Sequence, residues 1–71
     1  MADRKSVLVS FEDDHVEVFI AIDSEEEGFD SETLARFEVN RFVSEAQAKK
    51  SAERFAELVA LREGCTWGSN F

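Results

Sequence analysis

The sequence has few of the residues from which small folds build crosslinks. Its 71 residues include one cysteine, Cys65, and one histidine, His15. A single cysteine excludes a disulfide within the chain and favours a reducing compartment, so we expect a cytoplasmic location. Structural metal sites usually need several Cys or His ligands, so we expect neither a metal nor another cofactor. The three glycines are isolated, and no phosphate-binding glycine motif is present.

Long hydrophobic runs are absent as well. No stretch approaches the ~20 apolar residues that a membrane-spanning helix needs, so we expect no membrane association. The charged start of the chain, residues 1–5, is not followed by an apolar stretch and a small-residue cleavage site, and we expect no signal peptide. Hydrophobic residues make up 44% of the chain and are patterned, which indicates one folded domain over residues 1–71.

Basic residues are missing between Ser6 and Ala35, whereas Arg36 to Glu63 carries six basic and five acidic residues. Nucleic-acid backbones are bound through cationic contacts, so we expect no direct nucleic-acid binding. The charge instead favours a protein partner with a basic surface, including proteins that themselves bind nucleic acid. The ten acidic residues of the Ser6–Ala35 stretch are Glu12, Asp13, Asp14, Glu17, Asp23, Glu25, Glu26, Glu27, Asp30 and Glu32.

The same stretch contains alternating apolar and polar residues. Residues 6–12 and 15–23 each predict a strand, with Asp13 and Asp14 as a two-residue connection. Turn and hydrophobic pattern agree in register, which predicts a β-hairpin. The apolar pairs that this turn places on one face are Phe11 with Val16, Val9 with Val18, and Val7 with Ile20.

The region after the hairpin is less regular. Residues 24–33 predict an acidic loop. For residues 34–42 two interpretations remain open: a third strand, in which Phe37 and Val39 alternate with polar residues, or a short helix capped by Ser31. We favour the strand, because Phe37 and Val39 are β-type residues in a period of two.

The second half predicts a helix with marked ends. Ser44 and Gln47 match a capping box, and Gly64 suits a left-handed C-cap after a helix that runs to about Glu63. Leu61 points away from the apolar face. We expect that face to pack on the sheet. Its predicted members are Ala48, Ala52, Phe55, Ala56, Leu58 and Val59.

The expected fold is therefore α+β: a small antiparallel sheet, with the hairpin plus a third strand, packed on one face by a single C-terminal α-helix. The tail after Gly64 carries Trp67 and Phe71, which either fold back onto the core or wait for another chain, and we favour folding back. Three strands followed by a helix that opens with the residues Phe42-Val-Ser-Glu-Ala46 are similar in outline to the small DNA-binding modules at the front of phage-type integrases, which use a basic sheet. Here the sheet is acidic, so that resemblance implies the fold and not the function.

One helix covers only one face of a sheet, so the other face is predicted to be open. The expected open face has an apolar centre and an acidic rim, an arrangement typical of association sites. Its predicted residues are Leu8, Phe19 and Ala21 among Ser10, Glu12, Glu17 and Asp23.

Three patterns in the sequence could indicate a metal site or a catalytic residue. Residues 23–28 resemble the start of an EF-hand loop, but the twelfth position is Leu34 where a bidentate Glu is required. His15 among carboxylates could act as a general base or a metal ligand, yet hairpin turns carry such residues simply because they are solvated. Ser10 has no glycine-rich elbow or oxyanion-hole pattern beside it. We therefore expect no enzyme activity.

The resulting hypothesis is a small acidic protein-binding module, an inhibitor or regulator, whose carboxylates imitate nucleic-acid phosphates on a basic partner. In size and charge the chain resembles the small acidic inhibitors carried by phages and other mobile elements. The alternative is a structural or homo-oligomeric subunit, for example a homodimer, whose acidity serves only solubility. The predicted partner-binding residues are Glu12, Asp13, Asp14, Glu17, Phe19, Asp23, Glu25, Glu26, Glu27 and Trp67.

Overall fold

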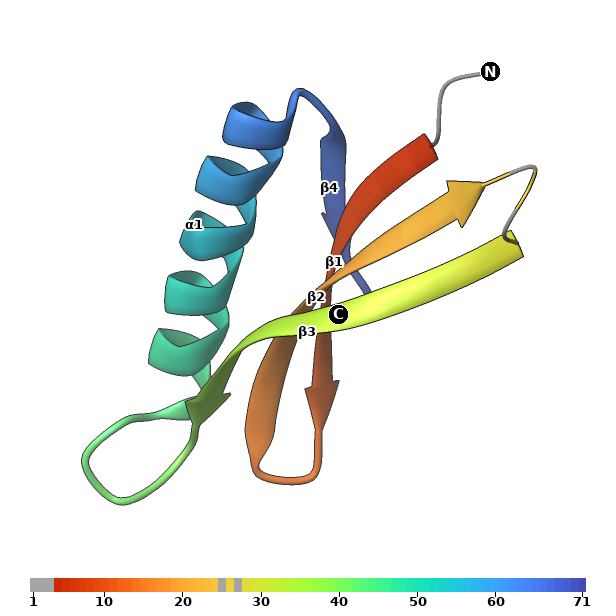
Figure 1. Cartoon of the computed structure of the whole chain (residues 1–71). Helices are drawn as coiled ribbons and strands as arrows, with labels where there is room; N and C mark the ends of the chain where they lie inside the picture. Colours follow the sequence, from red (N-terminus) through yellow and green to blue (C-terminus); the bar gives the residue numbers. More distant parts are fainter. Residues whose placement is uncertain (1–3, 25, 27) are drawn as a thin grey trace.

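A computed structural model describes residues 4–24, 26 and 28–71. It confirms an α+β fold in which one helix packs on one face of a sheet (Figure 1). Within these described residues the sheet has four strands, in the order β3-β2-β1-β4. The elements along the chain are β1 (Arg4–Glu12), β2 (His15–Ser24), β3 (Gly28–Glu38), α1 (Glu45–Glu63) and β4 (Thr66–Ser69).

The β1–β2 hairpin has the predicted register, with Phe11 opposite Val16 and Val9 opposite Val18. Asp13, in the two-residue turn, has a φ of 49°, a left-handed conformation that aspartate tolerates better than most residues. The inward side chains of the hairpin form the centre of the core. Its largest fully buried side chains are Val7, Val9, Val16 and Val18.

Strand β3 corrects the prediction for residues 24–42. It begins at Gly28, so most of the expected acidic loop is strand, and it ends at Glu38. The strand favoured for residues 34–42 is confirmed as far as Glu38, and Phe37 lies opposite the buried Val16 as the alternation requires. The strand also contains an irregularity: Val18 pairs with Ala35 but Phe19 pairs with Thr33, which leaves Leu34 as the extra residue. The bulge changes which residues face the core, and Phe29 is the one large apolar residue in the part of the strand before it, so the sequence shows no apolar alternation there.

Strand β4 is the second correction. It runs parallel to β1, with Val7 beside Trp67, so the sheet is mixed instead of entirely antiparallel. The tail does fold back, as expected. Asn70 continues the attachment, since its backbone N–H donates to the Val9 carbonyl at 3.0 Å and its Oδ1 accepts from the Phe11 N–H at 3.3 Å. Four residues, one of them glycine, are too few to show a strand period.

Helix α1 has the predicted ends, with the Ser44–Gln47 capping box and Gly64 at a φ of 68°. Its buried residues are all alanines at a spacing of four, namely Ala48, Ala52, Ala56 and Ala60. Such a row lets the helix approach the sheet closely. Leu61 points away, as expected, but Leu58 was wrongly placed on the apolar face: it is 54% exposed, because it lies about 200° around the helix from Ala56. Among the described residues, no helix is long and apolar enough to cross a bilayer.

Candidate protein-binding surfaces

The sheet face opposite α1, here called the outer face, carries an apolar strip. Alternation along the hairpin turns Leu8 and Phe19 to this face, where they pair directly across the strands and are half-buried. Ala21 shares the face but is only 8% exposed. Phe29, paired with Asp23, adds a side chain that is 71% exposed. Phe29 was assigned to a loop in the sequence, and only the pairing of β3 with β2 places it here.

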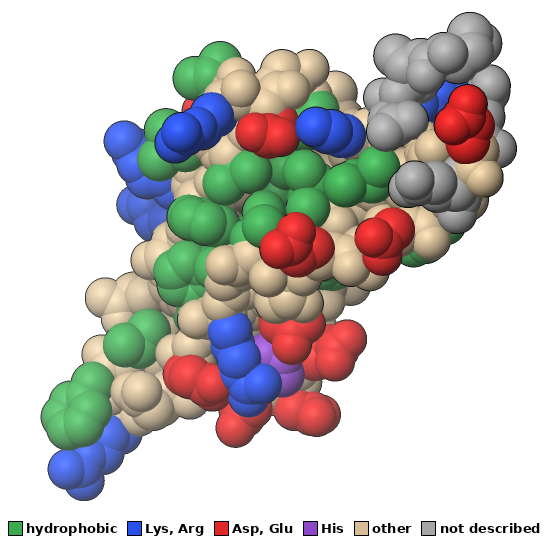
Figure 2. All heavy atoms as spheres, in the orientation of Figure 1, with side chains coloured by type: hydrophobic (Ala, Val, Ile, Leu, Met, Phe, Trp, Pro, Cys, Tyr) green, Lys and Arg blue, Asp and Glu red, His purple; other side chains and the backbone are tan. Residues whose placement is uncertain are grey.

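Carboxylates gather at the turn end of the hairpin. Glu12 ends β1, Asp13 and Asp14 form the turn, and Glu17 follows on β2. Glu38, at the end of β3, pairs with His15 and joins them. These five acidic residues are here called the hairpin-end cluster, and all of them except the half-buried Glu17 are exposed. Figure 2 shows acidic side chains surrounding the histidine and one basic side chain.

His15 is held inside this cluster. Its Nε2 lies 3.0 Å from Glu17 Oε1 and its Nδ1 lies 3.5 Å from Asp14 Oδ1, while its side chain is 11% exposed. Both ring nitrogens therefore face carboxylates of the protein. In the part of the chain that the structure describes, no group of three or more His, Cys, Asp or Glu residues is placed to hold a metal. This geometry suits a histidine that positions its neighbours.

Arg36 brings the one basic side chain into the cluster, and the sequence did not predict it there. It forms an ion pair with Glu38, and the hydrogen bond to Glu38, with the charges of Glu38, Glu17 and Asp14, raises the pKa of the Arg36 guanidinium. Both partners are about half exposed, so the pair stabilises the fold little. The signal available was the alternation of Arg36 and Glu38 with Phe37, which puts both charged residues on the face opposite the core.

The predicted acidic residues do not form one continuous row. Asp23 lies at the far end of β2 from Glu17, six residues or about 20 Å away along the strand, with Phe19 and Ala21 between them. Glu26 is exposed beyond that end. Glu25 and Glu27 lie outside the described residues. The acids of the hairpin are therefore divided between its two ends.

Trp67 lies apart from the outer face. Its register with the buried Val7 places it on the helix-bearing face, where it is 36% exposed. At the chain end, Phe71 is 44% exposed and contacts the ammonium of Lys49, which also lies 4.7 Å from the centre of the Phe11 ring. Trp67 and Phe19 therefore cannot anchor one flat partner surface together.

On the helix-bearing face, α1 leaves part of the sheet uncovered next to β3. A groove of about 350 Å³ lies there between β3 and α1, and its charged lining residues are Glu32, Lys5 and Glu63. In Figure 2 the corresponding hydrophobic side chains form a patch between the helix and the strands. The sequence did not predict this groove, because it depends on where the helix crosses the sheet. Its apolar lining consists of Ile20, Ile22, Leu34, Phe55 and Val59.

No family model matches this chain. No curated protein and no solved structure matches it either. The assignment of function therefore rests on the residues and surfaces of this chain alone.

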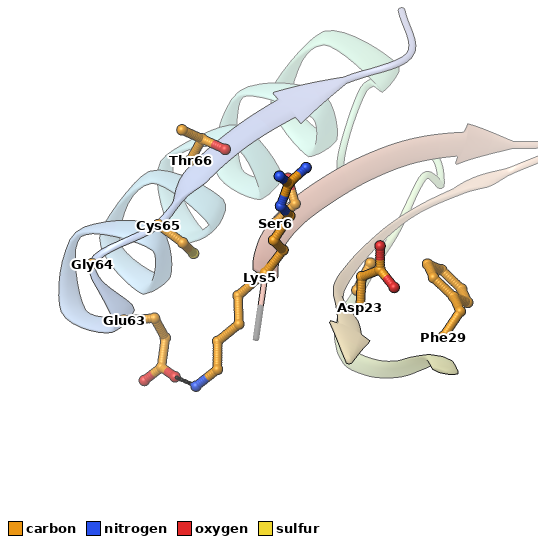
Figure 3. A pocket seen from close by; sticks show the side chains of 10 residues that line it. Lys5, Ser6, Asp23, Phe29, Glu63, Gly64, Cys65 and Thr66 are labelled. Carbon is orange, nitrogen blue, oxygen red and sulfur yellow. Dashed lines mark hydrogen bonds and ion pairs between the residues drawn. The ribbon is translucent and has the colours of Figure 1, made fainter. Parts of the chain in front are cut away.

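The outer face continues into a larger cavity at its Asp23 end (Figure 3). Its volume is about 650 Å³, and it lies between Phe29 and the end of α1 at Gly64. Lys5 and Glu63 form an ion pair of 3.4 Å along its border. The lining carries two basic side chains, Arg4 and Lys5, and two acidic ones, Asp23 and Glu63, so it has no net charge with which to select a ligand.

Proposed function

We propose that this chain is a non-catalytic protein-binding module, an inhibitor or regulator, whose outer face docks on a basic protein surface. The observation that carries the proposal is the apolar strip of the outer face, which runs from Leu8 and Phe19 near the hairpin-end cluster to Phe29 at the opposite end of β2. Association sites commonly combine an apolar centre with a polar rim. Here the rim is acidic, which selects partners by charge.

The two parts of the surface have different tasks. The hairpin-end cluster has five carboxylates against the single guanidinium of Arg36, so its field attracts a basic partner and steers its approach. Rim charges add little affinity once the complex has formed. Phe29 and Phe19 supply the apolar contact that resists dissociation, because aromatic side chains near the centre of an interface contribute most of its affinity.

Basic surfaces of this kind occur on nucleic-acid-binding proteins, where they receive phosphates. The exposed carboxylates of Glu12, Asp13 and Asp14 would occupy phosphate positions and block the nucleic acid. Self-association that brings the hairpin-end clusters of two copies together is disfavoured by comparison, since their carboxylates would repel one another.

The test is affinity capture from a host-cell lysate with the chain immobilised, followed by mass spectrometry at low and high salt. Phe29→Ser removes the exposed anchor, and Phe42→Ser is its matched control, because Phe42 is 78% exposed in the connection before α1. Glu12→Gln with Asp13→Asn raises the net charge by two in the cluster, and Glu57→Lys raises it equally on the helix.

The expected result is capture of nucleic-acid-binding proteins that weakens at high salt, is lost with Phe29→Ser, is reduced with the double variant and is kept with both controls. Capture that survives both outer-face variants would remove the proposal. Recovery of nothing but copies of the chain would instead favour the structural, homo-oligomeric alternative.

A further inference from the structure

Strand β3 is a long, uncovered edge of the sheet. It has 11 residues, and within the described chain it pairs on one side only, with β2. The opposite edge, β4, has four residues. Every second residue of an edge strand directs its backbone N–H and C=O outward, where another strand can pair with them. β3 is therefore the edge at which strand addition has room to occur.

The first half of this edge is acidic. Residues 28–33 are exposed, and they include Asp30 and Glu32 but no Lys or Arg. Their register with Ile22 and Ile20 places both carboxylates on the helix-bearing face, on the same side as the groove. Asp30 and Glu32 are two residues apart and so point the same way along the strand.

These charges determine which strand can be added. A second copy pairing antiparallel through the same half of its β3, centred on Ser31, would place Asp30 of one copy opposite Glu32 of the other, and like charges across a strand pair are destabilising. A segment with Lys or Arg at alternate positions would meet the same carboxylates favourably. Residues 28–33 span about 20 Å, which is the length of an average strand.

The groove supplies the apolar contact. Leu34 follows the acidic half of β3 directly and lines the groove together with Phe55 and Val59 of α1. A side chain beside Leu34 on an added strand would lie within cross-strand contact of it, at the mouth of the groove. The edge, the carboxylates and the groove therefore specify one ligand pattern: alternating basic residues followed by an apolar one on the same face.

We propose that an extended basic segment of a partner protein adds as a fifth strand to the outer edge of β3, with alternate Lys or Arg residues facing Asp30 and Glu32 and an apolar side chain entering the groove between β3 and α1. The basic character of the partner rests on the proposed function. The surface is a different one, since the hairpin-end cluster and Phe29 lie on the opposite face of the sheet. One partner could contact both.

The test uses the full chain and synthetic eight-residue peptides with Lys at two alternate positions and Val at the next alternate position, so that all three side chains share one face, measured by calorimetry and by backbone amide NMR. Binding is expected to shift amides of residues 28–38 and to slow their hydrogen exchange. Asp30→Lys with Glu32→Lys is expected to weaken binding by about tenfold or more and to favour a Glu–Val peptide instead. Glu53→Lys with Glu57→Lys makes the same charge change on α1 and is expected to leave the peptide preference unchanged.

Two peptides with alternate N-methyl groups separate strand addition from charge attraction alone. Methylation of the amides that face β3 is expected to abolish binding, while methylation of the other set keeps it. Equal binding of both methylated peptides, or shifts confined to the hairpin-end cluster, would overturn the inference. If the peptide binds β3 but lysate capture ignores Phe29→Ser, only the proposed docking of the outer face is lost. If capture needs Phe29 and the peptide does not bind β3, only this inference is lost.

Discussion

The packing of α1 on the sheet makes Ala56→Leu a sharp test of the fold. Ala56 is fully buried in the row of four alanines, so the added carbon atoms must displace the helix or a strand. Overpacking of this kind typically costs about 1–3 kcal/mol of unfolding free energy. A 71-residue domain has roughly 4–11 kcal/mol in total, so the loss is a large fraction. At about 2 kcal/mol the expected fall in Tm is about 8–16 °C for a domain of this size.

The assay is urea denaturation followed by circular dichroism, with thermal unfolding as a second measure. Ala46→Leu is the matched control, because Ala46 is exposed in the first turn of the same helix, and its stability is expected to change by no more than about 0.5 kcal/mol. An unchanged denaturant slope would show that both variants unfold from comparably compact states. If Ala56→Leu is as stable as Ala46→Leu, the alanine row does not press against the sheet and the described packing is wrong.

Three further substitutions test the ends of the helix and the core. Ser44→Ala removes the hydroxyl that accepts from the Gln47 N–H, and thermal melts are expected to show a loss of about 1 kcal/mol, whereas Ser44→Asp should keep most of the stability. Gly64→Ala meets no atom within 4 Å, so its cost is the left-handed backbone alone, about 1–2 kcal/mol by urea titration; a neutral result would contradict the C-cap geometry. Val18→Ala removes two buried carbon atoms and leaves a cavity, with an expected loss of about 2 kcal/mol by calorimetry, and a value below that of an exposed Leu61→Ala would speak against a core centred on Val18.

The predictable parts of this fold are those in which local pattern and tertiary structure agree. In the hairpin, a two-residue turn and a period of two specify the same register, and in α1 the Ser44 and Gly64 signals mark both ends. β4 could not be predicted, because four residues show no period and their parallel pairing with β1 depends on the path of the preceding helix. The first half of β3 could not be predicted for a related reason. The bulge at Leu34 changes which alternate residues face the core, and a strand prediction depends on that alternation.

For the candidate surfaces, the sequence predicted the kinds of residue that form them better than the places of those residues in the fold. The sequence located the apolar pair of Leu8 and Phe19 and the acids of the turn, because these follow directly from the hairpin register. It missed Phe29, Arg36 and Glu38, whose places are determined by the pairing of β3 with β2. The groove beside α1 depends on the crossing of helix and sheet, which no single segment of sequence records.

Solubility and binding need not be alternative explanations of the acidic first half. On β3, carboxylates at Asp30 and Glu32 oppose pairing with a second copy, and by the same electrostatics they would favour a basic strand. One pair of charges can thus keep a long edge from self-associating and select its ligand. The distinction between the two explanations is positional. Neutralising a carboxylate on α1, such as Glu57, changes the net charge and leaves the β3 edge unchanged. Neutralising Asp30 and Glu32 changes both the net charge and the charge of that edge. If only net charge matters, the two sets of variants would lose solubility equally and neither would change the preference for basic peptides.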